Sequence, residues 1–141
     1  MASLNKINKF VEDVLSGVHD FSSDTFKVAL TNSAPTAADT LLANVTQIAV
    51  AGGYASGGYT LDGVTLSQAS GTAKVVITDE VITASGASVG PFRYIALYND
   101  TSVSPADPLV GWYDYGSSIT LVDGDAITLN FDGTNGIFDL T

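Results

Sequence analysis

The chain lacks the side chains on which most catalytic and metal sites depend. Its 141 residues include no Cys, one His (His19), one Trp and five Lys and Arg residues together. The absence of Cys excludes a disulfide scaffold, a Cys-ligated zinc site and thiol catalysis. What the chain does contain is 14 Gly and a 45% share of hydrophobic residues, enough to bury a core at this length. We therefore expect a β-rich structural or binding protein, not an enzyme, with no cofactor.

Long hydrophobic runs are missing as well. No stretch of about 18 apolar residues occurs, so we expect no membrane-spanning segment. The first residues, MASLNK, are not followed by the apolar region of a secretory signal peptide, so we expect no signal peptide here.

Positive charge is scarce, and it is unevenly distributed. The formal net charge is −10, which disfavours nucleic acid and anionic membranes as partners. Residues 28–141 hold only Lys74 and Arg93 against eleven acidic side chains, whereas residues 1–27 hold three Lys against four acids. The N-terminal segment therefore differs chemically from the rest of the chain.

This N-terminal segment has the pattern of an amphipathic helix. Apolar residues recur at helical spacing, and Gly17 is a suitable residue to end a helix. The spacing predicts a helix over about 4–16, hence an N-terminal arm at 1–17. An isolated helix this short is marginal in water, so its apolar face must contact something. We expect this face to dock onto a neighbour through Leu4, Ile7, Phe10, Val11 and Val14.

Two roles for the segment are open at this stage. If the arm binds a neighbouring protein, a chain without residues 1–16 should keep its fold and lose that binding. The alternative is that the helix packs under its own β-sandwich.

From residue 18 onward the hydrophobic period changes to two, which is typical of β-strands. Phe26, Val28 and Leu30 alternate with less apolar neighbours, and a short helical turn is expected near Leu41. Many short strands separated by turns are typical of a β-sandwich or jelly roll. We therefore predict one all-β, sandwich or jelly-roll-like domain over 18–141. The further expected strands are about 45–50, 59–61, 64–68, 73–78, 80–84, 92–98, 109–115, 118–122, 126–131 and 136–140.

Turn chemistry adds detail to this prediction. Asp123-Gly124 separates two alternating apolar runs, which is the clearest hairpin signal in the chain. The run 92–98 is apolar on both faces and is expected to be a central strand. The Gly-rich residues 52–58 predict a flexible loop, without the Lys that a phosphate-binding loop needs.

Two patterns carry a weak chemical signal. Residues 86–90 match the G-x-S-x-G motif around Ser88. That motif requires a helix after the serine and a later His, but a β-type run follows and His19 lies upstream. The acidic residues near Asp123, Asp125 and Asp132 are better explained by turns than by a calcium site, so we expect no metal.

Aromatic residues form a further set: Tyr94, Tyr98, Trp112, Tyr113 and Tyr115. Exposed aromatics of this kind bind sugars, whereas buried ones fill the core between two sheets. We expect a core role. The alternative is that these aromatics are exposed and form a sugar-binding surface.

Four segments resemble a family of small structural proteins of tailed bacteriophages. These segments are 8–13 (NKFVED), 90–100 (GPFRYIALYND), 109–118 (LVGWYDYGSS) and 119–132 (ITLVDGDAITLNFD). The resemblance extends over about 5–135 and is to capsid cement, or head decoration, proteins.

The resemblance implies a role without catalysis. Such a protein binds the outer capsid surface of the virion, bridges major capsid protein subunits and stabilises the shell. It also implies synthesis in the bacterial host cytoplasm, self-association as a homotrimer or homodimer, and no catalytic residues. If the aromatic set is exposed, the alternative is a receptor- or carbohydrate-binding module of a phage head or tail fibre.

Overall fold

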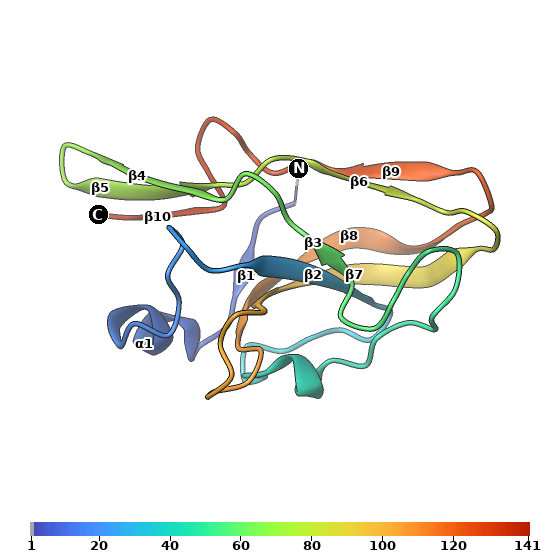
Figure 1. The fold of residues 1–141 in the computed structure, drawn as a ribbon, viewed down its shortest axis with the longest axis horizontal. Coiled ribbons are helices and arrows are strands. Elements are labelled where there is room, and N and C mark those ends of the chain that lie inside the picture. The colour runs from blue at the N-terminus through green and yellow to red at the C-terminus, as the bar shows by residue number, and fades with distance from the viewer. Residues whose placement is uncertain (1) are drawn as a thin grey trace.

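The structure is a computed structural model that describes residues 2–141. It is built mostly of antiparallel β-strands, with one short α-helix near the N-terminus (Figure 1). Among the described residues, no helix is long and apolar enough to cross a membrane. The elements are β1 (Asn5–Lys6), α1 (Phe10–Leu15), β2 (Phe26–Thr31), η1 (Leu42–Asn44), β3 (Tyr59–Thr60), β4 (Thr65–Ala69), β5 (Thr72–Val76), β6 (Glu80–Thr83), β7 (Val89–Asn99), β8 (Leu109–Leu121), β9 (Ala126–Leu129) and β10 (Phe138–Leu140).

The largest sheet has five strands in the order β1-β8-β7-β2-β3. β7 lies between β8 and β2, which confirms the central strand expected from its apolar run. In β2, Phe26, Val28 and Leu30 are fully buried, as the period of two predicts. Ala29 and Thr31 on the opposite face are buried as well, so the expectation of a half-buried strand was wrong.

A second layer lies across this sheet and encloses the core. It consists of the pair β6-β9 and a three-stranded sheet in the order β10-β5-β4 (Figure 1). Side chains of both layers meet between them, for example Tyr113 of β8 and Phe131, whose ring centroids are 5.8 Å apart. The all-β, sandwich-like body with a short N-terminal helix is therefore as predicted.

The N-terminal segment differs from its prediction. The helix expected over 4–16 is confined to α1, because residues before it form β1 and pair with the edge of β8. The backbone N–H of Ile7 continues this contact by donating to the Val110 carbonyl at 3.1 Å. Sheet hydrogen bonds thus replace the first two expected helical turns, since β8 offers an unpaired edge there.

Two strand predictions were wrong in detail. Residues 45–50 form no strand, and only an isolated bridge joins Gln47 to Thr31. The two strands expected at 109–115 and 118–122 are one strand, β8, which continues through an irregularity in its pairing with β7.

The hairpin predicted at Asp123-Gly124 was also wrong in its pairing. A turn does occur there, with the Asp125 N–H donating to the Val122 carbonyl at 2.8 Å. The strands on either side do not pair, because β8 bonds β7 and β9 bonds β6 in the other layer. A true hairpin joins β4 and β5 through Ser70-Gly71, where both residues have the positive φ angles of a tight two-residue turn.

The Gly-rich loop at 52–58 is packed against the body. Tyr54 is buried within it, and its hydroxyl donates to Gln47 Oε1 at 2.7 Å. At Gly58 a Cβ would collide with the Val28 carbonyl. Glycine here permits close approach to β2, and the expectation of a flexible loop was wrong.

Candidate docking groove between the helix and a three-stranded wing

The three-stranded sheet of β4, β5 and β10, here called the wing, has one apolar face. Residues directly opposite each other in a ladder share a face, and alternate residues along a strand do so too. Leu66 and Phe138 both pair with Val75, and Leu140 pairs with Ala73 two residues away. These five side chains therefore lie on the same face of the wing.

Part of this face is anchored in the core. Val75 is buried, and the ring of Phe138 lies 5.1 Å from that of Phe10 and 5.2 Å from that of Phe21. Aromatic pairs in such edge-to-face geometry add to the stabilisation from burial alone. Phe10 thus connects α1 to the wing.

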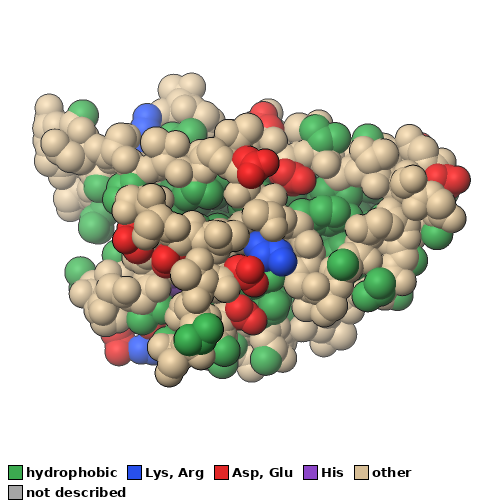
Figure 2. Space-filling model, viewed as in Figure 1, with side chains coloured by type: hydrophobic (Ala, Val, Ile, Leu, Met, Phe, Trp, Pro, Cys, Tyr) green, Lys and Arg blue, Asp and Glu red, His purple; other side chains and the backbone are tan. Residues whose placement is uncertain are grey.

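Beyond this anchor the apolar face remains open. Leu66 and Leu140 are exposed, as are Val11 and Leu15 on α1. Between the wing and α1 lies a groove of about 520 Å³, and Figure 2 shows hydrophobic side chains in the recess on this side of the molecule. The lining residues are Leu4, Lys6, Phe10, Val11, Val14, Leu15, Ile137, Phe138, Asp139 and Leu140.

Four of the five predicted docking residues line this groove. Leu4 and Val14 are half-buried, Val11 is exposed, and Phe10 is buried at the base. Ile7, the fifth, is fully buried in the core and does not reach the groove. The sequence did not indicate the opposite wall, since Phe138 and Leu140 are more than 120 residues away and only their strand was expected.

Charge around α1 is largely compensated. Lys9 Nζ lies 2.6 Å from Glu12 Oε1 and 3.5 Å from Asp13 Oδ1. The hydrogen bond with Glu12 raises the pKa of Lys9. The groove itself is lined by one Lys and one Asp, Lys6 and Asp139, and its other lining residues are apolar.

A buried histidine packs against α1. His19 is 6% exposed, and its ring lies 5.4 Å from that of Phe10. Its Nδ1 is 3.3 Å from Asn99 Nδ2, while its Nε2 is buried and finds no hydrogen-bond partner among residues 2–141. Burial lowers the pKa of His19, and the charges of Asp13 and Asp24 oppose this effect only in part.

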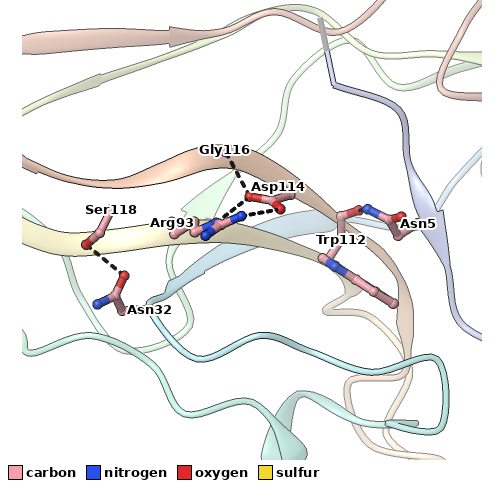
Figure 3. Close-up of polar contacts among 7 residues, drawn as sticks. All are labelled: Asn5, Asn32, Arg93, Trp112, Asp114, Gly116 and Ser118. Atoms are coloured by element: carbon pink, nitrogen blue, oxygen red, sulfur yellow. Dashed lines mark hydrogen bonds and ion pairs between the residues drawn. The ribbon is translucent and has the colours of Figure 1, made fainter.

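An ion pair joins β7 and β8 where their pairing is irregular. Arg93 Nε donates to Asp114 Oδ1 at 2.8 Å, and Arg93 Nη2 donates to Oδ2 at 3.0 Å (Figure 3). The Gly116 N–H also donates to Asp114. The hydrogen bonds from Arg93 lower the pKa of Asp114. In the same view, Asn5 Nδ2 of β1 donates to the Trp112 carbonyl.

Most of the aromatic set lies in or against the core. Tyr98 and Tyr113 are buried, Tyr94 and Trp112 are half-buried, and only Tyr115 is exposed. A second cavity of about 350 Å³ lies next to Tyr113 and Tyr115, between β8 and β9. The set therefore does not form a flat, exposed platform.

The remaining chemical candidates serve turns and strand ends. Ser88 directly precedes β7, so the helix that a nucleophile motif requires is absent at that point. The Asp123 and Asp132 carboxylates accept backbone N–H groups in turns. Within residues 2–141, no three His, Asp or Glu side chains gather closely enough to hold a metal ion.

Comparison with known proteins finds no match. No family model, no curated protein and no solved structure matches this chain.

Proposed function

We propose that this protein is a structural virion protein that binds the outer surface of a tailed-phage head. In this role it is a capsid cement, or decoration, protein that bridges major capsid protein subunits and stabilises the shell. It takes no part in catalysis and needs no cofactor.

The apolar groove supports this proposal most strongly. Leu15 is 85% exposed and Leu140 is 58% exposed, and both line one groove on a chain whose net charge is −10. Apolar side chains gathered in a concave site are typical of a surface that a partner covers. The sequence resemblance to cement proteins supplies the identity of that partner, an apolar segment of the major capsid protein.

Repetition explains how weak contacts stabilise a shell. Covering one exposed Leu side chain contributes about 1.5–3 kcal/mol before the costs of association. Each copy would therefore bind its capsid site with modest free energy. Because a capsid repeats that site many times, the summed contribution opposes the internal pressure of packaged DNA.

Co-sedimentation with expanded heads that lack this protein tests the proposal. We expect stoichiometric binding of many copies per head. Leu15→Asp should reduce this binding at least tenfold, because it places a charge in the apolar groove. Val103→Asp is the matched control, since Val103 is equally exposed (85%) in the loop between β7 and β8 and lies outside the groove. It should bind as the unchanged protein does.

Two results would contradict the proposal at different levels. If Leu15→Asp bound to heads as well as the unchanged protein does, the groove would not be part of the docking surface. Binding of only a few copies of the unchanged protein would exclude a cement role and favour a fibre component.

A further inference from the structure

β4 presents a free strand edge at the outer side of the wing. It is the last strand in the order β10-β5-β4, and all five of its residues are exposed. The hairpin of β4 and β5 extends away from the five-stranded sheet (Figure 1). Within residues 2–141, one side of the β4 backbone therefore has no neighbouring strand.

The hairpin register shows which backbone groups point outward. Ala69 and Thr72 flank a two-residue turn, so in this hairpin type they exchange both hydrogen bonds. Hydrogen-bonded and non-hydrogen-bonded positions then alternate along β4, so the N–H and C=O of Ser67 also bond to β5. Leu66 and Gln68 direct their N–H and C=O groups away from β5, symmetrically on either side of Ser67.

The edge also lacks the usual protection against pairing. Exposed edge strands commonly carry Lys, other charges or Pro, which prevent association with another strand. β4 has the sequence TLSQA, and residues 63–73 contain no charged side chain and no Pro. The strands of the wing hold one Lys and one Asp, Lys74 and Asp139, which lie at opposite positions in the ladder of β5 and β10.

We propose that β4 pairs in antiparallel orientation with β4 of a second copy of this chain. The two-fold axis passes through Ser67, so that Leu66 of each copy exchanges hydrogen bonds with Gln68 of the other. The six strands then form one continuous sheet. A contact of this kind is closed after two copies, so it gives a dimer and not a trimer.

Charge does not oppose a second copy at this surface. Two chains of net charge −10 repel each other wherever acidic surfaces meet. The wing has no net charge, so it allows approach at low electrostatic cost. The outward N–H and C=O groups of Leu66 and Gln68 lie at equal distances on either side of Ser67, so each set meets its complement in the second copy. This inference concerns self-association and does not depend on capsid binding.

Sedimentation velocity over a dilution series tests the dimer with the full chain. We expect a monomer–dimer equilibrium for the unchanged protein. Gln68→Pro should shift the chain to monomer, because it removes an outward N–H while leaving the bonds of β4 to β5 in place. Gln68→Thr, which keeps that N–H, should dimerise like the unchanged protein. A far-ultraviolet circular dichroism spectrum confirms that each variant is folded.

The absence of Cys allows a direct test of the register. In the proposed pair, Ser67 faces its own copy at a non-hydrogen-bonded position, with Cα atoms about 4.5 Å apart. A Ser67→Cys variant should therefore form a disulfide-linked dimer rapidly under mild oxidation. The control is Thr65→Cys, on the same face of β4, whose two copies would lie about 13 Å apart along the strands, beyond disulfide reach.

The results that would overturn the inference are distinct from those for capsid docking. A monomer at every concentration, or a trimer, contradicts the dimer. Equal crosslinking of the two Cys variants contradicts the register. Heads that bind a strictly monomeric protein would leave the proposed function intact and reject this inference alone.

Discussion

At the residue scale, the folded protein disfavours protonation of His19. Its ring is enclosed by Phe10, Phe21 and Phe26, and no partner satisfies its Nε2. A charged imidazole there would lose hydration, which is why burial lowers the pKa of His19 below its ordinary value of 6.5. The nearby carboxylates of Asp13 and Asp24 weaken this effect without reversing it.

This pKa shift predicts how stability depends on pH. Because the unfolded chain binds the proton more readily, the contribution of His19 is complete above pH 6.5 and decreases as the pH falls below it. The free energy of unfolding should fall by up to about 1.4 kcal/mol per pH unit in that range. Urea denaturation at several pH values measures this change in the free energy of unfolding. His19→Gln, which does not titrate, should flatten the dependence, and an unchanged slope in that variant would assign the effect to other groups.

At the scale of elements, the attachment of β10 decides whether the groove exists. β10 has three residues and, in the described part of the chain, pairs with β5 alone. Hydrogen bonds of so short a strand contribute little alone, so the packing of Phe138 against Phe10 and Phe21 must hold the wing near α1.

We therefore expect Phe138→Ala to loosen the wing. The lost contacts should lower the free energy of unfolding by about 2–3 kcal/mol, somewhat less than for a fully buried Phe. Hydrogen exchange should become faster in β5 and β10. Leu140→Ala, on the same strand but exposed, should change stability by less than about 0.5 kcal/mol. Similar losses in both variants would contradict the anchoring role of Phe138.

For the whole molecule, the structure changes what is expected of the N-terminal segment. Removal of residues 1–16 would take away β1, Ile7 and Phe10, which contribute to the central sheet and the core. The truncated chain should therefore lose its cooperative unfolding transition or melt far below the full chain, as thermal denaturation can measure. A truncated chain with an unchanged transition would support a separate arm. Point substitutions such as Leu15→Asp avoid this problem.

The sequence by itself determined the local structure over most of the chain. β2 and β7 follow from alternating or continuous apolar runs, and the turn at Asp123-Gly124 follows from the backbone preferences of those two residues. The apolar residues of the N-terminal segment were also sufficient to predict that it contacts something. These features depend on neighbours in sequence, which is why a single sequence specifies them.

The tertiary structure alone decided pairing and position. Residues 5–6 became a strand because β8 leaves an edge free, and β8 and β9 entered different layers although their turn resembles that of a hairpin. The groove likewise combines α1 with β10 from the opposite end of the chain. These contacts depend on which strand edges and apolar faces, far apart in sequence, remain uncovered in the folded chain. A local pattern of residues does not specify which of them will meet.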